Sequence, residues 1–278
     1  MKNKQARGIL CTMPAHASRM IVTVLGSGTS QGVPMIGCTC PVCRSTDPRD
    51  KRTRSSIYVE APSAKILIDT TPDMRQQALR EGLDHLDAVI LTHPHADHIM
   101  GFDDLRRFCD MQGGPLPLYG SAATLEQMER IFYYAFKPKK LVPGYVHVIP
   151  QVVEGPFELG GIQLTPLPVP HGAVSTLGFL FAQHGRKLLA YLSDCAEVPE
   201  AIRQLIADVE VLIIDGLRDA PHPTHLTVSG AIEIAQAVRA KRAFITHLTH
   251  ERFHVERQRQ LPAGIDVAYD GMKLEFDL

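Results

Sequence analysis

Three histidines and one aspartate crowd into the segment LTHPHADH at positions 91–98, directly after an apolar run. Imidazole nitrogens and carboxylate oxygens together suit borderline divalent ions such as zinc, and also manganese or iron. A lone histidine is usually a surface residue or a satisfied core residue, but this cluster is difficult to place that way. Four such ligands on one turn indicate two adjacent ions about 3.5–4 Å apart, a usual device for hydrolysing phosphate esters. The sequence therefore predicts a two-metal site built on His93, His95, Asp97 and His98.

Three further ligand-type residues each follow an apolar, strand-like run: His171, Asp194 and His247. Catalytic residues often lie where a strand of a rigid scaffold gives way to a loop. Any one of these positions alone would be weak support, but the placement is repeated three times. A two-metal site needs roughly seven or eight protein ligands, and these residues complete a set of that size.

Three cysteines lie within six residues in the segment GCTCPVC at positions 37–43. A C-x-C-x-x-C run can wrap one ion, and a fourth ligand would complete a tetrahedral structural zinc site. His250 is the candidate, because it lies three residues beyond His247 and can point away from the catalytic ions. The alternative is a set of reduced cysteines without metal, although clustered cysteines in a cytosolic protein more often bind metal than form disulfides. Three other cysteines have no obvious partner: Cys11, Cys109 and Cys195.

The composition is that of a cytoplasmic enzyme rather than a membrane or nucleic-acid-binding protein. The 278 residues carry a net charge of −1, so no global positive field attracts a polyanion. No apolar run approaches the ~20 residues needed to span a membrane, and no secretory signal is evident. Residues 1–19 lack a periodic pattern and are interpreted as an N-terminal extension. Residues 20–278 are expected to form a single domain with a zinc-binding insertion near 33–54.

Strand-like and helical periodicities alternate through both halves of the chain. Strands are expected at 21–25, 56–60, 65–69, 86–92, 115–120, 145–149, 162–169, 177–182, 187–193 and 210–215, with another running into His247. Helices are expected at 72–81, 97–109, 121–136, 198–206 and 228–240. The first of these helices should have Thr71 as its cap and Pro72 at its first position. Two sheets with helices outside, a four-layer αββα sandwich of the α/β (α+β) class, accommodate this order.

These motifs resemble, in order, the five motifs of the metallo-β-lactamase superfamily, which are Asp69 at a strand end, the HPHADH cluster, His171, Asp194 and His247. The resemblance extends from about residue 20 to residue 278 and implies a metal-dependent hydrolase. By this resemblance, one metal binds His93, His95 and His171, and the second binds Asp97, His98 and His247. Asp194 would bridge both ions, and Asp69 would support the histidine-rich turn from outside the ligand set.

Within that superfamily, the sequence resembles the PhnP-type cyclic phosphodiesterases of the carbon–phosphorus lyase pathway. The resemblance rests on the cysteine segment, on LGSGTSQGVP at 25–34 and on YDGM at 269–272. It implies that a structural zinc is held by Cys38, Cys40, Cys43 and His250. His225 matches a histidine near the scissile phosphate, and His222 is close but less well aligned. His225 would donate a proton or bind a phosphoryl oxygen, although an ordinary loop histidine is the alternative.

The resemblance implies two catalytic ions, Mn²⁺ or Zn²⁺, that share a water and lower its pKa so that the resulting hydroxide attacks phosphorus. Asp97 and Asp194 make the site oxygen-rich, which favours phosphodiesters and tolerance of manganese. We therefore expect a phosphodiesterase for small cyclic phosphodiesters, with phosphoribosyl cyclic phosphate as the family's example. The insertion near 33–54 could close one side of a small pocket. Whether the protein forms a homodimer remains an open question.

Two alternative functions remain. A tRNA 3′-end processing nuclease would carry a long Gly/Pro-rich arm after the histidine cluster, whereas this chain continues as GFDDLRR at 101–107. A non-hydrolytic protein of pyrroloquinoline quinone biosynthesis would have a degraded ligand set, whereas this set is intact. We therefore expect a small phosphodiester, and neither a nucleic acid nor a membrane, as the partner.

Overall fold

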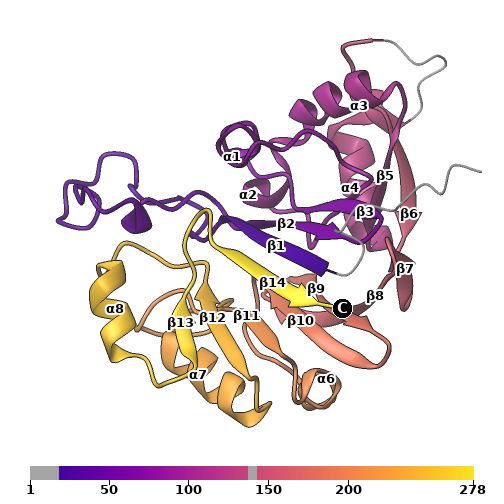
Figure 1. The fold of residues 1–278 in the computed structure, drawn as a ribbon. Coiled ribbons are helices and arrows are strands. Elements are labelled where there is room, and N and C mark those ends of the chain that lie inside the picture. Colours follow the sequence, from indigo (N-terminus) through magenta and orange to yellow (C-terminus); the bar gives the residue numbers. More distant parts are fainter. Residues whose placement is uncertain (1–18, 137–142) are drawn as a thin grey trace, which may run out of the picture.

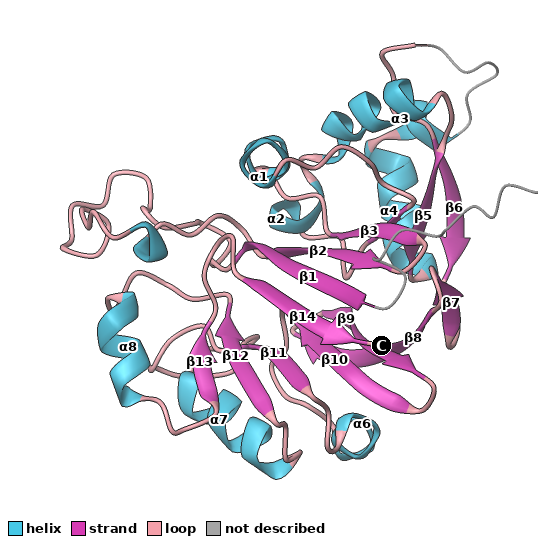
Figure 2. Ribbon diagram, in the orientation of Figure 1, coloured by secondary structure: helices cyan, strands magenta, loops and turns pink. Residues whose placement is uncertain are grey.

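The computed structural model describes residues 19–136 and 143–278 (Figure 1). Two seven-stranded sheets pack face to face, and helices cover their outer faces (Figure 2). The predicted αββα sandwich is therefore confirmed. Most of the predicted N-terminal extension, including Cys11, lies outside the described residues. The first strand begins at Arg19, one residue before the predicted start of the domain.

Both sheets are mixed, and parallel strands precede most of the candidate ligands. The first sheet has the order β14 (Lys273–Asp277), β1 (Arg19–Gly26), β2 (Ser56–Ala61), β3 (Ala64–Ile68), β4 (Ala88–Ile90), β5 (Leu116–Gly120) and β6 (Val148–Val152). The second has the order β13 (Ile265–Val267), β12 (Arg242–Thr246), β11 (Val211–Asp215), β10 (Arg186–Leu192), β9 (Val174–Gln183), β8 (Ile162–His171) and β7 (Phe157–Leu159).

Three apolar clusters hold the layers together. The central one joins alternate side chains of β1, such as Met20, Val22 and Val24, to Phe179 and Tyr191 of the facing sheet. The outer clusters bury α1 (Met74–Glu81), α2 (Ala96–Ile99), α3 (Arg106–Gln112), α4 (Ala122–Ile131) and α5 (Tyr133–Phe136) on the first sheet, and α6 (Glu200–Ile206) and α7 (Val228–Ala237) on the second. Because helices and the other sheet cover both faces of β11, all of its residues are buried.

Parallel pairing brings the candidate ligands to one edge of the sandwich. Strands β3 and β4 are parallel and end just before Asp69 and the histidine cluster. Strands β10, β11 and β12 are also parallel, and they end at or just before Asp194, Asp215 and His247. Because parallel strands end at the same side of a sheet, the candidate ligands that follow them lie along one edge of each sheet.

The single helix expected over 97–109 is wrong. The chain instead forms α2, a 3-10 turn η3 (Phe102–Leu105) and α3. Gly101 separates α2 from η3, and it lies so close to the loop before α1 that a β-carbon there would be 2.0 Å from the carbonyl oxygen of Thr71. Only glycine permits this approach, and the tertiary contact overrides the helical periodicity.

Other element boundaries also differ from the expectation. Helix α1 begins at Met74 with Asp73 at the capping position, not at Pro72 with Thr71 as its cap. The helix expected over 121–136 is interrupted at Phe132. The strand expected at 145–149 is β6, which begins at Val148. The pattern also missed three short strands, β7, β13 and β14, and α8 (His254–Gln260).

The insertion near 33–54 extends away from the sheets, on the side of α8 (Figure 1). Its base is nevertheless firmly tied to the body. The buried carboxylate of Asp270 accepts hydrogen bonds from Thr53 N and Oγ1 and from Ser27 N and Oγ. An ion pair of 2.9 Å joins Arg54 to Asp73, the residue that precedes α1. The base of the insertion is therefore fixed to the sandwich by these hydrogen bonds and this ion pair.

Candidate metal centre

The predicted first ligand set converges at the junction of the two sheets. His93 Nε2 lies 3.0 Å from His95 Nδ1, and His171 Nε2 lies 3.2 Å from the same atom. Nitrogens that share one tetrahedral ion at about 2.0–2.1 Å are expected to lie about 3.3 Å apart. The three side chains form one group of candidate ligand atoms within 4.8 Å of one another. The spacing therefore suits one ion between the three imidazoles.

A second set adjoins the first and contains Asp97, His98, Asp194 and His247. His98 Nε2 lies 3.3 Å from Asp97 Oδ2 and 3.2 Å from Asp194 Oδ1. The other carboxylate oxygen of Asp194 lies 3.2 Å from His247 Nε2 and 3.8 Å from His171 Nε2. Asp194 thus faces both sets, which is the position expected of a bridging ligand.

Asp69 holds the histidine-rich turn in place through contacts with His98 and Thr92. Its carboxylate lies 2.7 Å from His98 Nδ1 and accepts hydrogen bonds from Thr92 N and Oγ1, both at 2.8 Å. Thr92 Oγ1 lies in turn 3.0 Å from His93 Nδ1. Asp69 and His247 have φ angles of 66° and 60°, in the left-handed region that few residues other than glycine adopt. Such backbone strain is typical of sites that position side chains for function.

The unpaired polar atoms at the centre fit bound cations. In the described part of the chain, His98 Nε2, Asp194 Oδ1 and His247 Nε2 are buried without a hydrogen-bond partner. Leaving a buried polar atom unsatisfied costs about 1–3 kcal/mol, so a group of three that face one another needs a compensating ligand. A divalent cation satisfies all three at once, because each atom offers a lone pair.

The electrostatics of the centre also favour cations. Burial works against a charged imidazole at His98, but Asp194 and Asp69 outweigh it and hold the pKa of His98 well above its usual value. Burial likewise opposes charge on His247, yet Asp194 and Asp97 raise its pKa to about 9. The same carboxylates that stabilise protonated imidazoles stabilise divalent ions.

His225 lies beside both sets and is held by a residue that the sequence analysis did not single out. His225 Nδ1 lies 2.7 Å from Asp215 Oδ2, and Asp215 is fully buried. The His225 ring packs against His247 and His171, with ring centroids 4.7 Å apart in each case. Asp215 is the last residue of one apolar strand, and Asp194 follows another. This position at a strand end was the sequence signal that could have identified Asp215.

The loop that carries His225 is attached to the first ligand set. The Thr224 carbonyl oxygen lies 2.8 Å from His171 Nδ1 and fixes the orientation of that ring. Gly172, with a φ of 63°, packs so closely that a β-carbon there would be 2.8 Å from Thr224 Cγ2. The His171 turn and the His225 loop therefore form one packed unit.

The structure also brings the predicted zinc ligands together. Cys38, Cys40, Cys43 and His250 form one group of candidate ligand atoms within 4.8 Å of one another. His250 Nδ1 lies 3.5 Å from Cys38 Sγ and 3.3 Å from Cys40 Sγ, close to the roughly 3.5 Å expected around a tetrahedral zinc. The imidazole of His250 lowers the pKa of Cys40 to about 6, which favours the thiolate that zinc requires.

The two remaining described cysteines are buried and lie outside this group. Burial raises the pKa of Cys109 and, more strongly, that of Cys195. A buried thiol with a raised pKa is inert, so neither side chain is a candidate nucleophile.

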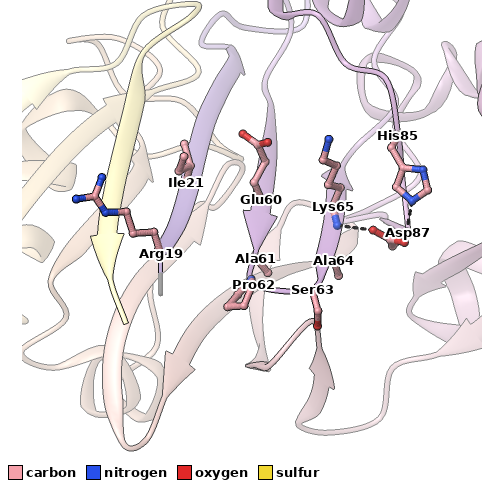
Figure 3. A pocket seen from close by; sticks show the side chains of 10 residues that line it. All are labelled: Arg19, Ile21, Glu60, Ala61, Pro62, Ser63, Ala64, Lys65, His85 and Asp87. Carbon is pink, nitrogen blue, oxygen red and sulfur yellow. Dashed lines mark hydrogen bonds and ion pairs between the residues drawn. The ribbon is translucent and has the colours of Figure 1, made fainter. Parts of the chain in front are cut away.

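A separate open hollow lies at the opposite ends of strands β1 to β3 (Figure 3). Several of its charged groups are paired, for example Lys65 with Asp84 at 2.8 Å and His85 with Asp87 at 2.9 Å. Its lining contains none of the clustered ligand residues. We therefore place the chemistry at the metal centre rather than in this hollow.

Comparisons with known proteins agree with the fold. A family model for the β-lactamase superfamily domain matches residues 64–248. Coenzyme PQQ synthesis protein B of Methylobacterium radiotolerans is 32% identical over 317 residues, covering 92% of this chain and 100% of that protein. The octanoyltransferase of Porphyromonas gingivalis is 37% identical over 259 residues, which are 91% of this chain and 51% of that protein. The chain thus spans about half the length of that relative.

Solved structures extend the comparison. A diphosphatase from the PhnP family is 43% identical, with a TM-score of 0.86 and coverage of 94% of this chain and 98% of that one. Zinc-bound PqqB from Methylobacterium extorquens is 24% identical with a TM-score of 0.76, covering 93% of this chain and 100% of that one, and shares the fold. The short form of human tRNase Z is 20% identical with a TM-score of 0.64, covering 91% and 98%, and also shares the fold.

The αββα sandwich and its paired sets of histidine and aspartate ligands define a metal-dependent hydrolase. The chain belongs to the metallo-β-lactamase superfamily, and it is similar to the PhnP branch. Within residues 19–136 and 143–278, no helix has the length and apolar character needed to cross a membrane.

Proposed function

We propose that this protein hydrolyses small phosphodiesters, cyclic ones included, at a two-metal centre. The observation that carries the proposal is the arrangement of two adjoining ligand sets on either side of Asp194. His93, His95 and His171 would hold one ion, and Asp97, His98 and His247 the other. Two ions so placed would activate a water and offset negative charge on the phosphoryl oxygens.

The side chains around the ions have complementary roles. Asp69 keeps His98 oriented, and the Thr224 carbonyl does the same for His171. Asp215 holds Nδ1 of His225 and thereby leaves the opposite nitrogen to face the reacting group. Protonated on that nitrogen, His225 would transfer a proton to the leaving ester oxygen, which departs more readily as an alcohol than as an alkoxide.

Two arguments favour a small substrate. The net charge of −1 gives no overall attraction for a polyanion. The structure that is 43% identical is described as a diphosphatase of the PhnP family. Cleavage of a diphosphate is therefore a second candidate activity, and it uses the same attack of water on phosphorus. A compact cyclic phosphodiester, such as phosphoribosyl cyclic phosphate, remains our preferred substrate.

The rival functions are less well supported. The likeness to tRNase Z, at 20% identity, extends to the fold alone. PQQ synthesis protein B is a full-length relative at 32% identity, but the ligand set here has seven members in two packed groups. An intact set of this kind favours a hydrolase over a binding protein.

The proposal includes Mn²⁺ or Zn²⁺ as the catalytic ions and one structural Zn²⁺ bound to Cys38, Cys40, Cys43 and His250. The unpaired thiols are compatible with a cytoplasmic location, which we also propose. A homodimer remains a prediction.

The experiment compares kcat/KM for a ribose cyclic phosphate with that for precursor tRNA, in one metal-loaded preparation. We expect efficient opening of the cyclic phosphate and poor cleavage of the RNA. A clear preference for the RNA would overturn the proposed substrate class, and no hydrolysis of either would favour a binding role. An organic diphosphate in the same assay tests the second candidate activity.

A further inference from the structure

A small cavity lies where the base of the insertion meets α8 and the segment that follows β12. Three arginines and one histidine contribute to its lining, and no carboxylate does. The lining residues are Arg52, Leu248, Thr249, Arg252, His254 and Arg257. None of them belongs to the three groups of ligands assigned above to the catalytic ions and the structural zinc. The cavity is therefore a separate feature that the proposed chemistry does not use.

Arg52 is a buried cation whose contacts are all neutral. Its side chain is 6% exposed. Nη1 donates to Ser27 Oγ at 2.8 Å and to the Ala268 carbonyl at 2.6 Å, and Nη2 lies 3.3 Å from His254 Nδ1. Among the described residues, no carboxylate oxygen lies within 4.0 Å of the Arg52 guanidinium. A charge buried without a contacting partner is costly, so this guanidinium lacks a counter-ion.

The carboxylates closest to Arg52 are engaged elsewhere. Asp270 binds Ser27 and Thr53, and Asp50 accepts from the backbone N of His254. Burial lowers the pKa of Arg52 to about 10, against the opposing influence of Asp270 and Asp50. The guanidinium therefore remains protonated at neutral pH, and its positive charge is not cancelled by contact.

The other two arginines of the cavity share a single carboxylate. Arg252 donates from Nε to Asp219 Oδ2 at 2.8 Å, and Arg257 donates from Nη1 to Asp219 Oδ1. Asp219 does not line the cavity. Arg257 is buried like Arg52, and its charge adds to the forces that lower the pKa of Arg52. Three guanidinium groups thus meet at a cavity with one carboxylate in contact.

The size of the cavity limits what it can hold. It has about 10 Å³ of room for the centre of a water-sized particle, which is about the space that one water molecule needs. Arg252 at its rim is exposed and can move to admit a slightly larger particle. One water or one monatomic anion fits, whereas a polyatomic anion such as sulfate is too large. The excess of guanidinium charge favours the anion, since a neutral water supplies no counter-charge.

We propose that this cavity binds one monatomic anion, such as chloride, between Arg52 and Arg257. The anion would join three segments at one point: the base of the insertion, the residues after His247 and helix α8. Through Asp219 it would also support the loop that carries His225. The site stabilises the protein and takes no part in hydrolysis, so the proposal does not depend on the proposed function.

Thermal unfolding of the metal-loaded protein tests the site. Chloride is titrated against gluconate at constant ionic strength, because gluconate is too large for the cavity. We expect Tm to rise with chloride and then to saturate. At a tenfold excess over Kd, one bound anion should raise Tm by roughly 3–6 °C. Crystals soaked in bromide should show one anomalous peak in contact with Arg52 and Arg257.

Three variants locate the effect. Arg52→Met removes the buried charge and should abolish the chloride-dependent rise. Arg252→Gln removes a charge from the rim and should weaken chloride binding by roughly twofold to fivefold, the usual value of an exposed charge. Arg239→Gln is the matched control, because Arg239 is an exposed arginine that pairs with Asp208 outside the cavity. It should keep the wild-type response.

Several results would overturn the proposal. These are an equal Tm of the wild type in both salts, a chloride response that persists in Arg52→Met, and a bromide peak at another position only. A water molecule in the cavity without a bromide peak would overturn it as well. If Arg52→Met does not fold, the bromide soak and the comparison of Arg252→Gln with Arg239→Gln still decide the question.

Discussion

At the scale of single residues, the active-site chemistry depends on which nitrogen of each histidine is available. Asp69, the Thr224 carbonyl and Asp215 each engage Nδ1 of one imidazole, namely His98, His171 and His225. Partners of this kind fix the tautomer and the orientation of a ring. Under the proposed function, the opposite nitrogen of each ring would then serve a metal or the substrate.

His225 should act as the proton donor, so His225→Ala should reduce kcat by roughly 10²–10⁴-fold, the usual contribution of general acid–base catalysis. Metal content should not change. The reduction should shrink for diesters with acidic leaving groups such as nitrophenol, because these need no proton. Steady-state kinetics on a series of aryl and alkyl diesters will measure this dependence. Equal damage across the series would make His225 a phosphate binder instead.

Asp215 should act through His225 as a positioning residue. Asp215→Asn keeps an oxygen for the Cys195 backbone N–H but removes the negative charge beside His225 Nδ1. We expect kcat to fall about 10- to 100-fold, with the same leaving-group dependence as in His225→Ala. In the double variant, the two losses should not add. Additive losses would show that Asp215 acts independently of His225.

The sequence located the contiguous ligand-type residues but not their long-range partners. The HPHADH cluster could be recognised because its donors lie within six residues. Asp215 lies ten residues before His225 and was seen only as the end of a strand. Asp270 binds Ser27 and Thr53 from more than 200 residues away, and no local pattern indicates that pairing.

At the scale of elements, the cysteine-bearing insertion and α8 are the parts least explained by the two-sheet core. The insertion packs a small apolar cluster of its own, Val33, Val42 and Cys43, against Phe253 in front of α8. A cluster of this size stabilises little by burial, so a bound zinc would supply much of the local order. The two segments are joined again through Asp50, which accepts a hydrogen bond from the His254 backbone N.

Replacing one zinc ligand should therefore remove one metal and reduce stability. Cys40→Ser is expected to lose about one equivalent of zinc and to lower Tm by about 5 °C or more. Cys109→Ser is the matched control, because Cys109 is a buried thiol outside the group. Metal analysis and thermal unfolding of the two variants will show the difference. Unchanged zinc content in Cys40→Ser would contradict the structural site.

The packing of α8 on the insertion should also weaken in acid. Burial and the neighbouring guanidinium of Arg52 lower the pKa of His254 from 6.5 to about 4. The fold therefore favours the neutral ring, and this stabilisation is complete above pH 6.5 and is lost as the pH falls towards 4. His254→Asn keeps an acceptor for Arg52 but cannot ionise, so over this range it should lose about 1–2 kcal/mol less unfolding free energy than wild type. Urea unfolding at pH 7 and pH 4.5 measures this, and parallel losses would contradict it.

Element boundaries were predicted less well than element types. The apolar periodicity over 97–109 is real, since Ile99, Phe102 and Leu105 are fully buried, but it continues across three separate turns. The break results from the contact of Gly101 with the carbonyl of Thr71, 30 residues earlier. A pattern of apolar residues records which face is buried and cannot record such a contact.

At the scale of the whole molecule, the metal centre joins the two halves of the sandwich. Asp69 and the histidine cluster come from the first sheet, and His171, Asp194 and His247 come from the second. Alternation of apolar residues was sufficient to predict two sheets with helices outside. The face-to-face assembly that places both ligand sets at one edge was implied only by the resemblance.

The central claim is that phosphodiester hydrolysis depends on two ions that share Asp194. The most direct test is the rate of hydrolysis of bis(4-nitrophenyl) phosphate as a function of metal content, for the wild type and Asp194→Ala. The account predicts no activity in the stripped protein and full activity only when both catalytic positions are filled beside the structural zinc. It also predicts that Asp194→Ala loses at least one ion and nearly all turnover. Full activity in that variant with both ions retained, or in the stripped wild type, would contradict the account.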